Sequence, residues 1–210
     1  MKGKEKNGSM LTDAEKRRLE RFEKISEDMI RQGYVRHDLT VGMGKANMFA
    51  ILLLIPLVVV GFGLYYLVNR GLEFSDFNPL IFIAAIVALT VVHELIHGAC
   101  WSLFTPHRFK DIEFGIMKPS MTPYCACLVP LKKQQHVFGT VMPLILLGIL
   151  PMIVAIAIGN LDLLLIGIIM ADGAAGDIMI ISMILGYRSA AKEIVYMDHP
   201  TEAGGVVFER

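Results

Sequence analysis

The chain has 210 residues, of which 54% are hydrophobic and 19% are charged, and its formal net charge is zero. The charged fraction lies below the roughly 25% of ordinary soluble domains, and the mean hydropathy is +0.55. This balance favours an integral membrane protein, and we expect no nucleic-acid partner. The three cysteines form no disulfide framework, because their number is odd and two of them are separated by one residue.

Residues 1–48 are polar and hold more than half of the lysines and arginines. A capping-box pattern, Thr12 with Glu15, is followed by apolar residues at helical spacing until Gly33. The pattern predicts an amphipathic helix that lies on the membrane, lies on the protein's own cytoplasmic face, or is simply solvated. We therefore assign these residues to a cytoplasmic N-terminal segment.

Four long apolar segments follow, each near or above the roughly 20 residues that cross the hydrocarbon of a bilayer. They are residues 49–68, 79–104, 137–158 and 161–185. Pro143 and Pro151 are expected to bend the third segment. Basic residues fall in alternate loops, which predicts a multi-pass protein of the cell membrane with both termini in the cytoplasm. We predict an all-α integral membrane protein, with a four-span domain at 49–186 and a cytoplasmic tail at 187–210.

The second apolar segment carries LTVVHELIHGACW, in which residues 93–97 fit the pattern HExxH. Ionisable groups inside a span cost about 2.5–3.5 kcal/mol each, so three together need a common reason. His93 and His97 share a helix face and can reach one ion. Glu94 lies about 100° round the helix, where it can take a proton from a metal-activated water. Alternatively, the histidines are buried, hydrogen-bonded residues that bridge spans, and Glu94 is a paired acid.

A catalytic zinc needs a third protein ligand, and the fourth segment offers Asp172 and Asp177. Counted from the outer end of each span, Asp177 is level with the two histidines. Asp172 lies about 7 Å further out at a rise of about 1.5 Å per residue. Asp177 is therefore the preferred ligand and Asp172 the alternative. The small residues at 173–176 can pack closely against another helix, and they can also unwind locally to present Asp177; the two interpretations are compatible.

The loop at 105–136 contains MTPYCACLVPL, which is typical of a short extended segment and would lie in the cytoplasm. A strand edge near the site could hold a peptide in extended form. Cys125 and Cys127 would point to the same side of a strand, but no partner pair for a second metal site is evident. We interpret His107 and His136 as ordinary residues of the membrane interface.

Four features resemble the bacterial membrane family of zincin peptidases: HELIHG in the second span, YCACLVPL, a proline-containing third span, and GAAGD in the fourth. The layout is also distantly similar to the core of site-2 intramembrane metalloproteases. The resemblance implies that His93, His97 and Asp177 bind zinc and that Glu94 is the catalytic base. No Asn-Pro precedes Asp177, in contrast to site-2 proteases, so no residue is assigned to transition-state stabilisation beyond the metal.

These patterns predict a zinc-dependent intramembrane or membrane-proximal peptidase. Its partners would be membrane lipid and transmembrane or membrane-associated polypeptide substrates. Two other classes stay open: a non-catalytic membrane metalloprotein that acts as a regulator or scaffold, and a structural subunit in which these residues only pack. Metal content distinguishes the structural subunit from the other two classes, and the activity of Glu94→Gln distinguishes an enzyme from a scaffold.

Overall fold

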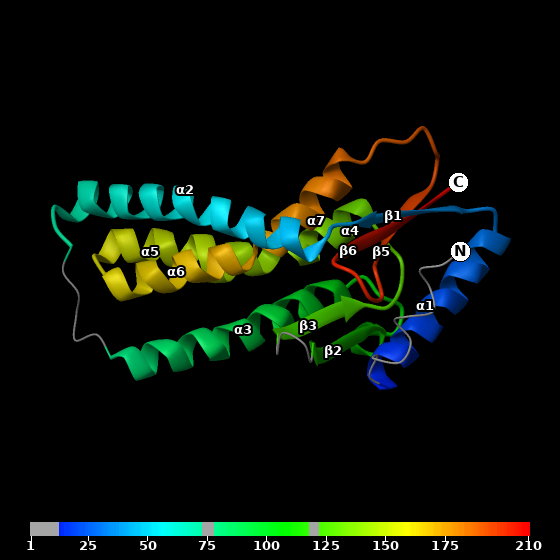
Figure 1. The fold of residues 1–210 in the computed structure, drawn as a ribbon, viewed down its shortest axis with the longest axis horizontal. Helices are drawn as coiled ribbons and strands as arrows, with labels where there is room; N and C mark the ends of the chain where they lie inside the picture. Colours follow the sequence, from blue (N-terminus) through cyan, green and yellow to red (C-terminus); the bar gives the residue numbers. More distant parts are fainter. Residues whose placement is uncertain (1–12, 73–77, 118–121) are drawn as a thin grey trace.

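The structure, a computed structural model, describes residues 13–72, 78–117 and 122–210. It has two parts, a bundle of long apolar helices and a small sheet that lies at one end of the bundle with a helix beside it (Figure 1). The predicted capping box depends on Thr12, which lies outside the described residues.

Three helices are long and apolar enough to cross a membrane. They are α2 (Met43–Asn69), α3 (Pro79–Ser102) and a continuous helix over Lys133–Ile158 that comprises α4 (Lys133–Pro143), the π-helical turn η2 (Leu144–Ile149) and α5 (Leu150–Ile158). The fourth apolar segment forms two helices, α6 (Leu161–Gly173) and α7 (Ala175–Gly186), with a bend of 45° between them. The described residues therefore contain three candidate spans, or four if the bent pair is one span.

Local sequence explains where these helices begin and end. Asn78 is the N-cap of α3, and its side chain accepts hydrogen bonds from the N–H groups of Leu80 and Ile81. Gly159 ends α5 with a φ of +71°, a left-handed conformation that glycine adopts without strain. Asn160 then caps α6 at once. The connection between the third and fourth apolar segments is therefore as short as the sequence predicts.

The outer surface of the bundle carries exposed apolar side chains, which fits helices that could cross a membrane. Ile51, Val59 and Leu67 on α2 are each more than half exposed. Inside the bundle, small residues allow close approach, since a Cβ added at Gly148 would lie 2.9 Å from the Cα of Ala171. This contact presses α6 against η2, as is usual where helices pack in lipid.

The expectation of an all-α protein is wrong, because the chain also contains a four-stranded antiparallel sheet in the order β1-β6-β5-β4. Its strands are β1 (Val35–Thr40), β4 (Leu131–Lys132), β5 (Ile194–Asp198) and β6 (Gly204–Glu209). β1 and β6 come from opposite ends of the chain and pair from Val35↔Glu209 to Thr40↔Gly204. Such short strands are stable only when paired, and no local pattern reveals a partner so distant in sequence.

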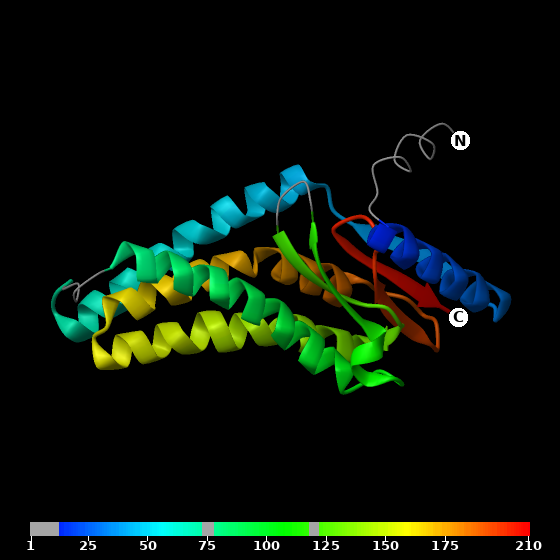
Figure 2. The same ribbon diagram turned by 90° about the horizontal axis from the view of Figure 1, so that it is seen from below.

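The helix α1 (Asp13–Arg31) covers one face of this sheet. Phe22 on α1 packs in one apolar cluster with Met197, Val206 and Phe208. The amphipathic helix predicted from the sequence therefore lies on the protein's own surface. The ends of α4 and α7 cover the other face, and α1 and the C-terminus lie at this end of the bundle (Figures 1 and 2).

A β-hairpin lies beside α3 and fills the space between the bundle and α1 (Figure 2). It consists of β2 (Ile112–Met117) and β3 (Thr122–Cys127) and follows a short 3₁₀ turn, η1 (Arg108–Asp111). The predicted extended segment is β3, whereas its partner strand was not predicted. Arg21 of α1 donates to Asp111 at 2.7 Å, and the Arg18 guanidinium lies 4.5 Å from the centre of the Tyr124 ring. α1 therefore connects the hairpin to the sheet.

Candidate metal centre

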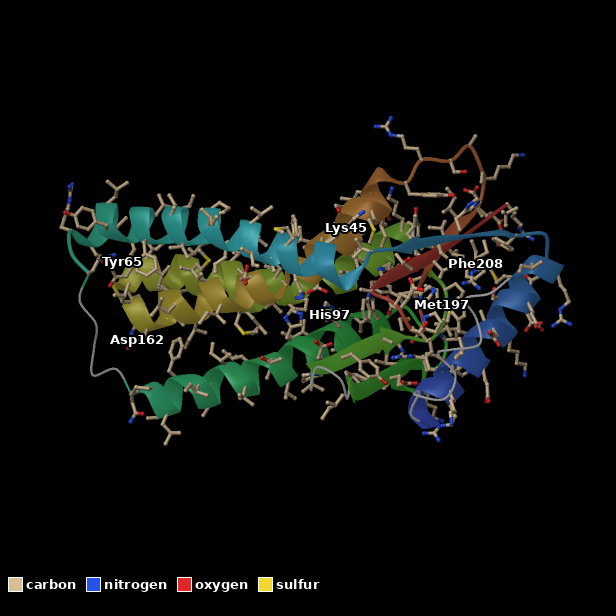
Figure 3. The ribbon with its side chains drawn as sticks, in the orientation of Figure 1. Lys45, Tyr65, His97, Asp162, Met197 and Phe208 are labelled. Atoms are coloured by element: carbon tan, nitrogen blue, oxygen red, sulfur yellow. The ribbon has the colours of Figure 1, made fainter. Side chains whose placement is uncertain are left out.

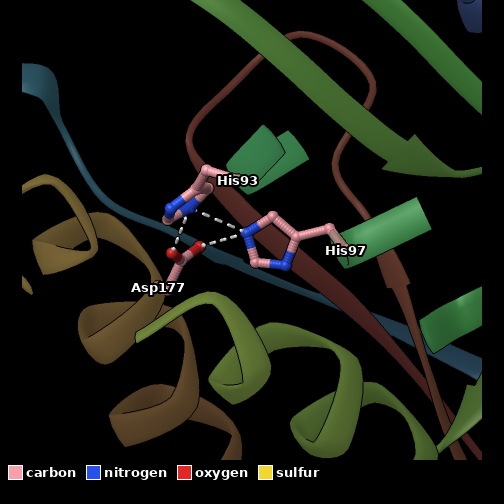
Figure 4. A group of neighbouring side chains, drawn as sticks. All are labelled: His93, His97 and Asp177. Atoms are coloured by element: carbon pink, nitrogen blue, oxygen red, sulfur yellow. Dashed lines mark hydrogen bonds and ion pairs between the residues drawn. The ribbon is translucent and has the colours of Figure 1, made fainter. Parts of the chain in front are cut away.

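Three potential metal ligands meet between α3 and α7 (Figure 4). The Nε2 atoms of His93 and His97 lie 3.1 Å apart. The Asp177 carboxylate reaches both, with Oδ2 at 3.0 Å from His93 Nε2 and Oδ1 at 3.3 Å from His97 Nε2. Both histidines are buried, and His97 lies toward the end of the bundle that faces the sheet (Figure 3). The structure thus brings the motif histidines together with Asp177, the aspartate selected by depth.

These separations suit a zinc ion. Ligand atoms at about 2.0–2.1 Å from a tetrahedral zinc lie about 3.3 Å from one another. The two Nε2 atoms lie 3.1 Å apart, close to this value, and each has one of the two Asp177 oxygens at 3.0 or 3.3 Å. One ligand atom from each residue lies within 4.8 Å of the other two. The donor set of two imidazole nitrogens and one carboxylate is also the set that catalytic zinc sites use.

A hydrogen bond between His97 Nδ1 and the Gly139 carbonyl determines that His97 Nε2 presents a lone pair to the cluster. The Gly139 carbonyl can only accept, so the His97 Nδ1 atom, 2.9 Å away, carries the hydrogen. In the neutral imidazole, Nε2 then presents a lone pair to the Asp177 carboxylate, which is also an acceptor. Two acceptors 3.3 Å apart repel each other unless a cation or a proton lies between them. A metal ion on the Nε2 side of His97, with the Gly139 carbonyl behind the ring, would satisfy this arrangement.

The indole of Trp101 fixes the orientation of the His97 ring. The two rings stack with centroids 5.1 Å apart and an interplanar angle of 13°. The Trp101 Nε1–H donates to the His136 carbonyl at 3.1 Å, and the ring lies so close to Gly139 that a Cβ there would overlap it. Sequence reasoning assigned no role to Trp101 or Gly139. The only signal in the sequence is that Trp101 lies one helical turn after His97 and Gly139 lies one turn after His136.

The bend between α6 and α7 explains how Asp177 reaches the histidines. The break lies at Ala174, so Asp177 falls in the first turn of the new helix α7. Free N–H groups and the helix dipole at that end favour a carboxylate. A Cβ at Gly173 or Gly176 would meet no atom within 4 Å. The two glycines therefore leave open space where the helix breaks, whereas Ala174 and Ala175 between them are buried.

Glu94 faces a cavity beside the cluster. The cavity has a volume of about 700 Å³, and its lining includes Glu94, His97 and Asp177. The backbone N–H of Cys125 on β3 donates to the Glu94 carboxylate. Residues 123–126 also line the cavity. The motif glutamate therefore lies between the metal cluster and the outer edge of β3.

The other candidates from the sequence lie outside the cluster. The Asp172 atom Oδ1 is buried and has no hydrogen-bond partner in the described part of the chain. Among the described residues, Cys125 and Cys127 join no group of three or more possible metal ligands. Burial raises the pKa of the Cys127 thiol to about 12 and raises that of Cys125 further, so neither is a ready metal-binding thiolate.

The two loop histidines differ from each other. His107 is exposed and lies 3.3 Å from Asp111, so an ordinary surface position describes it well. His136 is fully buried and lines the cavity, so its interpretation as an ordinary interfacial residue is wrong. The reason is that the sheet, which was not predicted, covers this end of α4.

A His/His/Asp cluster between apolar helices, with the HExxH glutamate beside a cavity, is typical of a membrane-embedded zincin. The family described as "Putative zincin peptidase" matches residues 86–192, just over half of the chain. The chain belongs to this family. No curated protein and no solved structure matches it.

Proposed function

We propose that the protein is a zinc-dependent peptidase that cleaves membrane-associated polypeptides within or next to the membrane. The observation that supports this most directly is the convergence of His93, His97 and Asp177 beside the cavity that Glu94 lines. Zinc is the cofactor that the family implies, and these three side chains would hold it. Three protein ligands would leave one position of a bound zinc for water and substrate, as in catalytic rather than structural zinc sites.

Each residue has one role in this proposal. A bound zinc would polarise the peptide carbonyl and lower the pKa of a water molecule. Glu94 Oε would accept the proton of the attacking water and pass it to the leaving amine. The Cys125 N–H holds the Glu94 carboxylate toward the cavity. The Gly139 carbonyl and the Trp101 indole keep His97 Nε2 directed at the cluster.

The substrate would be a transmembrane or membrane-associated polypeptide that is locally extended at the site. β3 pairs with β2 along one edge only, and residues 123–126 present its other side to the cavity. Because the Cys125 and Cys127 N–H groups of this edge already contact Glu94 and Asp198, an extended segment would bind by donating its own main-chain N–H groups to the β3 carbonyls. In the proposed orientation, the sheet, both chain termini and the water entry to the cavity lie on the cytoplasmic side of the cell membrane.

Glu94→Gln tests the proposal. We expect the purified variant to bind one zinc per chain with wild-type affinity, because Glu94 is not a ligand. Cleavage of a membrane-protein substrate pool should fall by about 10²–10⁴-fold, the usual contribution of a general base. A wild-type chain that binds zinc but cleaves no more than Glu94→Gln would favour a non-catalytic regulator or scaffold. A chain that binds no zinc would indicate that the residues only pack.

A further inference from the structure

Asp198, the last residue of β5, connects three elements at the wall of the cavity. Its Oδ1 lies 3.1 Å from His136 Nε2 on α4. Its Oδ2 accepts a hydrogen bond of 2.7 Å from the backbone N–H of Cys127 on β3. Asp198 lies beyond residues 86–192, the part of the chain that the family covers. One carboxylate thus joins the C-terminal strands to the helix and the strand that border the metal cluster.

The first oxygen acts on the side of the cluster that holds His97. The Thr140 hydroxyl donates its hydrogen to the His136 carbonyl at 2.8 Å, so toward His136 Nδ1 at 3.2 Å it can only accept. His136 Nδ1 therefore carries a hydrogen that Thr140 accepts, and Nε2 contacts Asp198. The His136 carbonyl also receives the Trp101 Nε1–H. His136 is thus fixed one helical turn from Gly139, whose carbonyl binds His97.

The second oxygen acts on the side of the cluster that holds Glu94. Cys127 and Cys125 are alternate residues of β3, so their N–H groups leave the same edge of the strand. The Cys127 N–H meets Asp198, and the Cys125 N–H meets Glu94. Asp198 therefore fixes the position of β3 at Cys127, and the Cys125 N–H of the same strand contacts Glu94.

We propose that Asp198 is a positioning residue of the metal centre, which acts through His136 on His97 and through β3 on Glu94. The proposal rests on the function proposed above. It makes the sheet formed by the two ends of the chain a part of the active centre, although the HExxH helix lies in another part of the fold. Neither oxygen of Asp198 touches the metal cluster, so its effect is on orientation rather than on ligation.

The hydrogen bonds predict an unusual order among variants of Asp198. In Asp198→Asn, the side-chain carbonyl can accept the Cys127 N–H, and the amide can donate to Nε2 of a neutral His136, so both contacts survive. Asp198→Glu keeps the charge but displaces the carboxylate by one methylene. Asp198→Ala removes both contacts. A role in positioning therefore ranks Asn above Glu and Ala, whereas a role in charge balance ranks Glu above Asn.

The experiment measures zinc affinity of the purified full-length chain by chelator competition, and the visible absorption of the Co²⁺-loaded chain. We expect Asp198→Ala to weaken zinc binding by about 10- to 100-fold, the range found when groups behind a metal ligand are removed. Its Co²⁺ spectrum should shift, that of Asp198→Asn should match wild type, and that of Asp198→Glu should lie between them. Asp38→Ala, an exposed carboxylate on β1 of the same sheet, is the matched control and should change neither property.

The outcomes separate the two proposals. Equal zinc affinity and identical Co²⁺ spectra across the series, or Glu ranking above Asn, would overturn the role of Asp198 while the metal site stands. If Asp198→Ala does not fold, as judged by thermal unfolding without metal, the comparison of Asn with Glu decides alone. A wild-type chain that binds no zinc would overturn the metal site itself, and the positioning role with it.

Discussion

Gly139→Ala should damage both the stability of the fold and the metal site. The added Cβ would overlap Cδ1 and Nε1 of Trp101 and lie 2.8 Å from Cγ. The indole has little room to retreat, because it stacks on His97 and packs in a buried cluster with Ile112, Cys127 and Leu131. Overpacking of this kind costs about 1–3 kcal/mol. Loss of the Trp101 hydrogen bond to the His136 carbonyl adds about 1 kcal/mol.

The expected total is therefore about 2–4 kcal/mol of unfolding free energy. Denaturant unfolding of the metal-free protein in detergent measures this loss, and zinc competition measures the effect on His97. Gly63→Ala on α2 is the matched control, because a Cβ there would meet no atom within 4 Å. That control should be neutral or up to about 1 kcal/mol more stable, the difference in helix propensity. Equal stability of the two variants would refute the packing that we describe around Trp101.

Three further predictions follow from other contacts. Asp177→Ala should lose stoichiometric zinc and Asp172→Ala should keep it; the reverse order in elemental analysis would reassign the third ligand. Burial alone would raise the pKa of Asp111, but hydrogen bonds from the His107 N–H and Arg21 hold it below 3.8. A carboxylate with a lowered folded-state pKa stabilises the fold at pH values above its unfolded pKa, and this stabilisation is lost as the pH falls through the folded pKa. The unfolding free energy should therefore drop as the pH falls below about 4 in wild type, and less steeply in Asp111→Asn. Cys127 should resist alkylation at pH 8 in the folded protein, because burial raises its pKa to about 12, and rapid labelling by mass spectrometry would contradict this burial.

The apolar helices could be predicted because the apolar composition and the length of each one can be read from its own segment of the sequence. Their lengths and composition are visible in any window of about 20 residues, and Asn160 with Gly159 marks a turn within two residues. The sheet could not be predicted in this way. β1 contains Arg36, His37 and Asp38 among its six residues, so no regular apolar alternation indicates a strand. It is a strand because Gly204–Glu209, near the other end of the chain, pairs with it.

The candidate metal ligands could be predicted from the sequence for a different reason. In helices that cross a membrane, the depths of residues on separate helices can be compared along one axis, the membrane normal. His93, His97 and Asp177 fall at one depth when each is counted from the outer end of its own span, and that count needs no knowledge of tertiary contacts. Counting depth along a span predicts no contacts for residues outside the spans. His136 stands near the start of α4 and Asp198 at the end of β5, and their contact at 3.1 Å depends on a sheet assembled from both ends of the chain. In this protein, the HExxH motif and the depth of the aspartates select the atoms proposed to bind the metal, whereas the groups that orient those atoms become visible only once the distant strands are paired.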